Sequence, residues 1–328
     1  MTPGQAQSLA VQAAAFFAGT DPVLLKLREN AVFSMDLRGA RTALRLHRRG
    51  YQTAQAIRSE LWWMTALADA GLCVPRPVPT LSGDPLAALP DGTLASALTW
   101  IDGVPLGEGG VPLPQPPAEQ ARLHHALGQS LARLHDATDR LTLPPGFIRP
   151  SWDRDGLVGE TPFWGRFWDH PGATPDDRAL LRRTRDTARN LLGEYVSVPA
   201  DQGLIHADVL RENVLIDGTK AALIDFDDCG FGFRLYDLGT ALSQCLSEPA
   251  LPDIAAAFTD GYASIRPLSA RDRAMLPWMT LLRCTASVGW MVPRLPPDDP
   301  RHRTYIARAT WAARILLDGD NLFAPPGP

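Results

Sequence analysis

Several residue types and patterns are scarce in this chain, and each scarcity argues against a class of protein. The four cysteines lie far apart and form no C-x-x-C pair, so we expect reduced thiols rather than a disulfide framework. Lysine is scarce and the formal net charge is −4, which leaves no broad basic surface for nucleic acid. No apolar run reaches membrane-spanning length, because even residues 276–292 are interrupted by Pro277 and Arg283. We therefore expect neither nucleic acid nor a membrane as a partner.

The opening residues lack the charged front of a signal peptide. No basic residue precedes Lys26, although residues 8–19 are largely apolar. With 328 residues, 45% of them hydrophobic and 21% charged, the composition is that of a soluble globular protein with roughly two domains. These features predict a cytoplasmic location and leave the oligomeric state open.

The first hundred residues have the pattern of a small lobe that contains strands and one helix. Apolar residues alternate from residue 31 to residue 47 around a turn at Arg38-Gly39, which predicts a hairpin. Residues 53–71 have apolar side chains at helical spacing, with Gly71 at the position of a C-terminal cap. Residues 96–103 then predict one more strand that ends in a glycine turn. The small lobe is therefore expected to end near residue 100.

The remaining sequence predicts a larger lobe that is mostly helical. A connector rich in Gly and Pro covers residues 107–120, and a strongly amphipathic helix follows it. Residues 144–180 are too rich in Pro, Gly and Trp to form one regular element. Further helices are predicted at 176–195, 234–247, 252–264, 270–292 and 302–318. We expect an α+β protein with a small lobe at 1–100, a hinge and connector at 101–117 and a larger lobe at 118–328.

Four polar residues stand at regular intervals around a predicted hairpin in the larger lobe. His206, Asp208 and Asn213 form H-x-D-x-x-x-x-N, and Asp225 follows twelve residues later. The strands 214–216 and 221–224, with a turn at Asp217-Gly218, should bring Asn213 and Asp225 to the same end of the hairpin. An amide oxygen and a carboxylate so placed can hold Mg²⁺ together with phosphate oxygens. Asp208 could then accept the proton of an attacking hydroxyl.

Together these residues resemble the protein-kinase-like phosphotransferases of the aminoglycoside phosphotransferase, choline kinase and homoserine kinase group. The resemblance is carried by I-H-A-D-V-L-R-E-N, by L-I-D-F-D-D and by Y-D-L-G at 236–239, and extends more weakly over most of the chain. It implies a two-lobed protein-kinase-like fold, with a small antiparallel-sheet lobe that holds one main helix. It also implies Asp208 as catalytic base, Asn213 and Asp225 as metal ligands, His206 as the residue that orients the catalytic loop, and Asp237 as a buried support.

The resemblance implies ATP and Mg²⁺ as cofactors, with a nucleotide site in the small lobe. Trp100, Ile101 and Asp102 would form the hinge beside adenine, and residues 28–34 would lie over the phosphates. Family members usually carry a Lys on the third strand, paired with a helix Glu. Here the matching residues are Arg45 and Glu60, and Arg keeps the charge and can bind phosphate through two donors. No G-x-G-x-x-G loop is present.

Three classes of function are open: a small-molecule kinase, a protein Ser/Thr kinase of the bacterial stress-response type, and a nucleotide-binding pseudo-enzyme. Asp237 follows Asp225 by only twelve positions and no A-P-E follows, which favours a small acceptor such as an amino alcohol, amino acid or aminoglycoside. The acceptor and the choice between ATP and GTP stay open.

Simpler structural roles are the alternatives for several of these side chains. Arg45 and Glu60 could form a solvated surface pair. His135 is interpreted as a helix-packing residue. The aromatic residues of the irregular segment could line an acceptor site, but burial in the core is the favoured interpretation; they are Trp152, Phe163, Trp164, Phe167 and Trp168.

Overall fold

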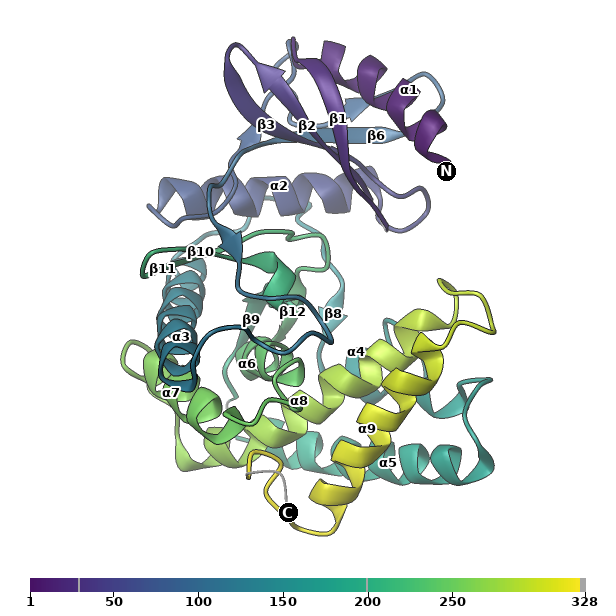
Figure 1. The fold of residues 1–328 in the computed structure, drawn as a ribbon, viewed down its shortest axis with the longest axis vertical. Coiled ribbons are helices and arrows are strands. Elements are labelled where there is room, and N and C mark those ends of the chain that lie inside the picture. The colour runs from purple at the N-terminus through teal and green to yellow at the C-terminus, as the bar shows by residue number, and fades with distance from the viewer. Residues whose placement is uncertain (29, 199, 325–328) are drawn as a thin grey trace. The chain divides into compact units, whose positions relative to one another are not determined.

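The computed structural model describes residues 1–28, 30–198 and 200–324, which form two compact units (Figure 1). The first unit comprises Met1–Gly103, Arg140–Arg149 and Ala222–Asp227. The second contains the rest of the described chain. Two later segments therefore belong to the first unit, whereas the expected division at 1–100, 101–117 and 118–328 is continuous in sequence. That functional division stays a prediction.

The first unit is built on a twisted antiparallel sheet with strand order β1-β2-β3-β6-β4, and β5 also pairs with β6. The hairpin predicted around Arg38-Gly39 is confirmed, because Leu37 pairs with Ala40 and Ala31 pairs with Leu46. Its elements are α1 (Pro3–Ala15), β1 (Thr20–Leu27), β2 (Ala31–Leu37), β3 (Ala40–Leu46), α2 (Ala54–Asp69), β4 (Pro77–Val78), β5 (Ala87–Ala88) and β6 (Leu94–Thr99).

Helix α1 covers one face of this sheet and was not expected from the sequence. Its buried residues are all alanines, at positions 6, 10, 13 and 14, and they pack with Phe33 and Leu44 in one core. Small side chains at helical spacing let the helix lie close to the sheet, but they give little contrast between an apolar and a polar face. Thr2 and Gln5 form a capping box that fixes where the helix begins. The pattern of alanines therefore concealed the helix.

Strand alternation places Arg45 on the sheet face opposite to α1. Leu44 and Leu46 belong to the α1 core, so the residue that separates them points the other way. The predicted helix at 53–71 is confirmed as α2, with Thr53 as its N-cap and with Gly71 at φ +83° just beyond its end. This helix carries Glu60, which is fully buried.

The expected phosphate loop at 28–34 is shorter than predicted. Strand β1 ends at Leu27 and strand β2 begins at Ala31, so residues 31–34 are part of the sheet rather than a loop. Glu29 lies outside the described residues. The alternating apolar residues of the hairpin continue to residue 31, and this periodicity correctly marks the start of the strand.

The second unit is mostly helical, as expected, and the five predicted helices at 176–195, 234–247, 252–264, 270–292 and 302–318 are confirmed. Two small sheets, ordered β11-β10-β7 and β8-β12-β9, accompany them. The chain passes from the second unit to the first within β11. The elements after Gly103 are β7 (Val104–Pro105), α3 (Pro117–Asp139), β8 (Ser151–Trp152), α4 (Arg154–Val158), η1 (Phe167–Asp169), α5 (Pro175–Val196), β9 (Gln202–Ile205), η2 (Arg211–Asn213), β10 (Val214–Asp217), β11 (Lys220–Leu223), β12 (Gly230–Phe233), α6 (Arg234–Ser243), α7 (Leu251–Ala263), α8 (Ala270–Met291) and α9 (Arg301–Leu317).

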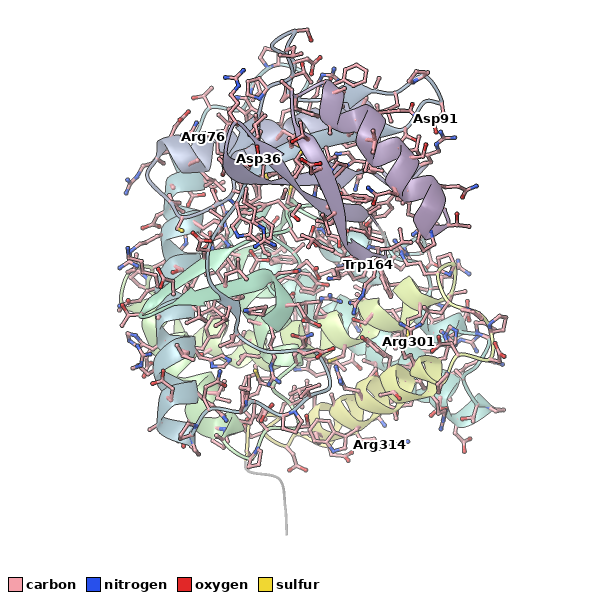
Figure 2. The ribbon with its side chains drawn as sticks, turned by 45° about the horizontal axis from the view of Figure 1, so that its top comes forward. Asp36, Arg76, Asp91, Trp164, Arg301 and Arg314 are labelled. Carbon is pink, nitrogen blue, oxygen red and sulfur yellow. The ribbon has the colours of Figure 1, made fainter. Side chains whose placement is uncertain are left out.

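The irregular segment before α5 contributes aromatic side chains to the core. Trp152 stacks on Tyr236 and meets Trp164 edge to face, and Trp164 is labelled in Figure 2. Trp152, Trp164, Phe167 and Trp168 are buried, which confirms the interpretation of these four as core residues, whereas Phe163 is half-buried. In the part of the chain that the structure describes, every helix falls short of the length or apolarity needed to cross a membrane.

Helices α3 and α7 approach each other closely through two glycines. A Cβ on Gly128 would lie 2.2 Å from the carbonyl oxygen of Phe258, and a Cβ on Gly261 would lie 2.1 Å from that of His125. Backbone atoms occupy the space that a side chain would need. These glycines therefore set the spacing of the two helices.

We predict that Gly128→Ala destabilises the protein. The overlap with Phe258 forces the helices apart, at a cost of about 1–3 kcal/mol that exceeds the gain in helix propensity. Gly4→Ala is the matched control, because its Cβ would meet nothing within 4 Å. Chemical denaturation should show a loss for the first variant and none for the second. Equal stability of Gly128→Ala and the wild-type chain would contradict the close packing.

Candidate active site

The loop before Asp208 is held by the fully buried carboxylate of Asp237, which lies in the first turn of α6. Asp237 Oδ2 accepts a hydrogen bond from the backbone N–H of His206 at 2.8 Å, and Oδ1 accepts one from that of Ala207 at 2.6 Å. Burial raises the pKa of Asp237, while His206 and the two N–H donors oppose this shift. The expected role of Asp237 as a buried support is confirmed.

His135 has a more specific role than the helix packing assigned to it from the sequence. Its Nε2 lies 3.0 Å from Asp237 Oδ2 and its Nδ1 lies 2.8 Å from the hydroxyl of Tyr262. Burial lowers the pKa of His135 well below its ordinary value, which favours the neutral ring, and Nε2 is placed to donate to Asp237 Oδ2. His135 and Asp237 are 102 residues apart in sequence, and no local pattern could reveal this contact.

The side chains of Asp208 and Asn213 meet directly. Asn213 Nδ2 donates to the backbone oxygen of Asp208 at 3.0 Å and to its Oδ2 at 2.8 Å. The amide nitrogen is thus engaged by Asp208, which leaves Asn213 Oδ1 as the atom that can bind a cation. An amide oxygen is a ligand that suits Mg²⁺, so Asn213 fits the role that the sequence predicts.

Arg283 is the residue of this cluster that sequence reasoning missed. Its Nη2 lies 2.8 Å from Asp208 Oδ1, and its side chain is buried in the middle of α8. Burial acts to lower the pKa of Arg283, but Asp208 raises it above the ordinary value. The two partners are 75 residues apart, and Arg283 stands in a helix whose sequence predicts only packing.

The first unit holds a second cluster, around Arg45. Arg45 Nη2 donates to Glu60 Oε1 in a buried ion pair, and Arg45 Nη1 lies 3.7 Å from Asp225 Oδ1. Burial acts to lower the pKa of Arg45, but Glu60, Asp227 and Asp225 together raise it above its ordinary value. The predicted pairing with Glu60 is confirmed, and the alternative of a solvated surface pair is wrong. The binding of nucleotide by these residues stays a prediction.

The Arg45 cluster contains more acidic than basic groups. Asp227 is buried and accepts a hydrogen bond from Asn30 Nδ2 at 3.0 Å, while Arg149 Nη1 lies 3.9 Å from Glu60 Oε2. Burial raises the pKa of Asp227 to about 6, and Glu60 and Asp225 add to this. Three carboxylates (Glu60, Asp225 and Asp227) thus face two guanidinium groups (Arg45 and Arg149). An added cation is electrostatically favoured here.

The predicted hinge residues follow β6 at the end of the first segment of the first unit. The guanidinium of Arg41 stacks 3.6 Å from the ring centre of Trp100, so this ring is covered on one face. Ile101 is half-buried and Asp102 is exposed. Their contact with adenine stays a prediction.

The structure thus gathers the predicted residues into two groups. Asp208 and Asn213 are bonded in the second unit, and Arg45, Glu60 and Asp225 lie together in the first. The expected closeness of Asn213 and Asp225 stays a prediction.

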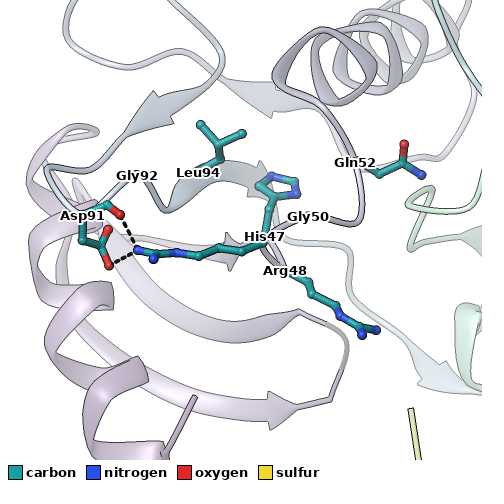
Figure 3. A pocket seen from close by; sticks show the side chains of 8 residues that line it. His47, Arg48, Gly50, Gln52, Asp91, Gly92 and Leu94 are labelled. Carbon is teal, nitrogen blue, oxygen red and sulfur yellow. Dashed lines mark hydrogen bonds and ion pairs between the residues drawn. The ribbon is translucent and has the colours of Figure 1, made fainter. Parts of the chain in front are cut away.

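A cavity of about 260 Å³ lies at the end of β3 in the first unit (Figure 3). None of the predicted site residues lines it. Across it, Arg49 pairs with Asp91, and burial lowers the pKa of His47 well below its ordinary value, so His47 is neutral. His47 Nε2 lies 2.9 Å from the hydroxyl of Ser96. The polar side chains at this cavity thus already have partners within the protein, and we do not take the cavity as the candidate site.

Comparison with known proteins decides the family. A family model described as "Phosphotransferase enzyme family" matches residues 24–276, which is most of the chain. The chain belongs to this family. The match includes Arg45, Glu60, Asp208, Asn213 and Asp225, whereas Arg283 lies beyond its end.

Two curated relatives are kinases. An amicoumacin kinase of Bacillus subtilis (strain 168) is 26% identical over 212 residues, 62% of this chain and 57% of the relative. A homoserine kinase of Gluconobacter oxydans (strain 621H) is 31% identical over 230 residues, 66% of each. The chain thus spans less than two thirds of the length of these relatives.

A solved structure matches almost completely. The structure of a microcompartment-associated aminopropanol kinase superposes with a TM-score of 0.84 at 33% identity, covering 96% of this chain and 99% of that one. The expected protein-kinase-like α+β fold is confirmed.

We predict that Ala207→Gly leaves stability unchanged or raises it slightly. Ala207 has φ +64°, a conformation that costs a residue with a Cβ about 1–2 kcal/mol. Glycine removes this strain and loses one buried methyl group in exchange. Ala132→Gly in α3 is the control, because that alanine is equally buried in regular helix and should lose about 1–2 kcal/mol. Equal losses in the two variants would show that Ala207 is unstrained.

Proposed function

We propose that this chain transfers the terminal phosphate of ATP to the hydroxyl of a small molecule. The observation that carries the proposal is the Asp208 carboxylate, which is bonded to Asn213 on a loop fixed by Asp237, in a chain of the phosphotransferase enzyme family. A carboxylate in this setting suits a group that accepts a proton from an attacking hydroxyl.

The acceptor that the relatives favour is an alcohol that also carries an amino group. Homoserine and aminopropanol, from which two of the matched kinases take their names, share this chemistry. The match to the aminopropanol kinase covers nearly the whole of both chains, which supports a small acceptor. The twelve-residue connection from Asp225 to Asp237 supports it too, since it leaves little room for a peptide-docking segment.

The residues divide the work of the reaction. Asp208 orients the acceptor hydroxyl and takes its proton as the hydroxyl oxygen bonds to the terminal phosphorus and the bond from that phosphorus to the β-phosphate oxygen breaks, which releases ADP. Arg45, held by Glu60, contacts the nucleotide phosphates and offsets charge that develops during transfer. Trp100, Ile101 and Asp102 place the adenine.

The donor atoms fit a divalent metal ion. Asn213 Oδ1 and the Asp225 carboxylate, whose side chain is 43% exposed, are the oxygen ligands that Mg²⁺ prefers. The excess of carboxylates around Arg45 also favours an added cation. When bound, the ion neutralises charge on the transferring phosphoryl group.

The decisive experiment is a transfer assay with ATP labelled in the terminal phosphate. The panel contains aminopropanol, homoserine, other amino alcohols, aminoglycosides, sugars and a generic protein, each with Mg²⁺ and with EDTA. Transfer to a small alcohol only with Mg²⁺ would support the proposal. Transfer to protein alone would favour a protein Ser/Thr kinase, and nucleotide binding without any transfer would favour a pseudo-enzyme.

We predict that Asp208→Ala lowers kcat by at least about 100-fold, because the hydroxyl loses the group that accepts its proton. Nucleotide affinity, measured by titration calorimetry with Mg²⁺, should change little. Asp201→Ala is the control, because Asp201 pairs with Arg266 rather than with the Asp208 loop. Wild-type turnover in Asp208→Ala would remove Asp208 from the role of base.

A separate prediction concerns Arg45. Arg45→Ala should weaken nucleotide binding by about 10-fold or more, because it removes a charge-assisted phosphate contact and the hydrogen-bonded partner of the buried Glu60. Arg58→Ala, which removes an ion pair with Asp84 in the same unit, is the control. If Arg45→Ala binds ATP as tightly as wild type at equal folded fraction, Arg45 does not contact the phosphates.

A further inference from the structure

Arg283 is a buried cation that pairs with an acidic side chain. It lies in the middle of α8 with its Nη2 2.8 Å from Asp208 Oδ1, and Asp228 adds a smaller electrostatic attraction. Its remaining contacts hold the guanidinium in place: Nη1 donates to Ser287 Oγ at 2.6 Å, and the ring centre of Trp164 lies 4.9 Å away. A buried arginine costs solvation free energy, which only a well-placed partner offsets.

The carboxylate of Asp208 is bound at both of its oxygens. Oδ1 accepts from Arg283 Nη2 and Oδ2 accepts from Asn213 Nδ2, each at 2.8 Å. Donors on two separate oxygens fix the rotation of the carboxylate about its bond to Cβ. The side chain of Asp208 is only 16% exposed, so little freedom is left to it.

The two helices that hold the Asp208 loop are packed tightly against each other. Helix α6 carries Asp237, which binds the backbone of the loop, and α8 carries Arg283, which binds the side chain of Asp208. A Cβ on Gly239 of α6 would lie 2.6 Å from the backbone of Met279 in α8. Backbone and side chain of the loop are thus anchored to one rigid pair of helices.

We propose that Arg283 is a positioning residue, which holds the carboxylate of Asp208 in the orientation that receives the acceptor hydroxyl. This inference rests on the proposed function, because it assigns a geometric requirement to the same reaction. Arg283 donates to Asp208 and Ser287, and its guanidinium lies over the ring of Trp164. Its effect on the reaction is therefore exerted through Asp208.

The test is a kinetic double-mutant cycle in the full chain. Arg283→Met should lower kcat by about 100-fold, as expected for a misplaced catalytic group, with the KM for ATP unchanged. Arg283→Lys should recover about 10-fold of this loss, since it restores the charge but not the two-sided contact. In an Asp208→Ala background, Arg283→Met should have no further effect on kcat. An equal fall in both backgrounds, or a changed KM for ATP with unchanged kcat, would overturn the proposal.

Arg266→Met is the matched control for general destabilisation. Arg266 is also a partly buried arginine of the second unit, but it pairs with Asp136, Asp139 and Asp201. At a comparable fall in melting temperature, this variant should keep wild-type kcat. A similar loss of kcat in both variants would reduce Arg283 to a structural role.

The melting temperatures of wild type, Arg283→Met, Asp208→Ala and the double variant test the contact between Arg283 and Asp208 without an acceptor. If Arg283 holds Asp208, the double variant should melt at a higher temperature than the sum of the two single losses predicts, because neither partner is left buried alone. Additive losses would overturn the proposal even if no panel acceptor were phosphorylated. A wild-type chain that transfers phosphate to nothing would instead contradict the proposed function alone.

Discussion

The buried carboxylate of Asp237 is the constraint on which the candidate active site depends. A charge without solvent is stable only where donors surround it, and here the backbone N–H groups of His206 and Ala207 and the ring of His135 supply them. Hydrogen bonds to a charged group contribute about 1.5–3 kcal/mol each, enough to hold Ala207 in its left-handed conformation. The hydrogen bonds to Asp237 thus offset the backbone strain at Ala207, the residue directly before Asp208. Asp208 follows directly, and its orientation is a consequence of this anchoring.

In the first unit, the position of Arg45 is set by the alternation of side chains along β3. The apolar neighbours of Arg45 face the alanine helix α1, so Arg45 must face α2, where Glu60 occupies a buried position on the helix. The guanidinium then donates to Glu60 through Nη2, and its Nη1 lies 3.7 Å from Asp225 Oδ1. The alternation of side chains along β3 thus places Arg45 opposite Glu60, and the packing around the two side chains excludes solvent from the ion pair.

The sequence predicts best what depends on short spacing. The hairpin after Asn213 and most helices follow from alternation or helical periodicity over a few residues, whereas the pairing of Arg45 with Glu60 was expected from the resemblance to the kinase family. The helix α1 was missed because alanine gives little contrast between faces. The contacts of His135 with Asp237 and of Arg283 with Asp208 join residues 102 and 75 positions apart, and each side chain stands in a helix that shows only a packing pattern. Such contacts are created by the tertiary fold, so no window of sequence contains them.

Arg45, which the resemblance places at the position of a strand lysine, suits the charge of its surroundings. A lysine ammonium is a compact point charge, whereas a guanidinium offers five donors in a plane and can bind two carboxylates at once. Around Arg45 three carboxylates are opposed by two guanidinium groups. Burial raises the pKa of Asp227 to about 6, and Glu60 and Asp225 add to this shift while Arg45 opposes it. A divalent cation at Asp225 would offset the part of the shift that Asp225 contributes. The surplus of carboxylates therefore supports the proposed metal ligand at Asp225, and Arg45 holds the acidic side chains in one cluster, because its Nη2 binds Glu60 and its Nη1 lies 3.7 Å from Asp225.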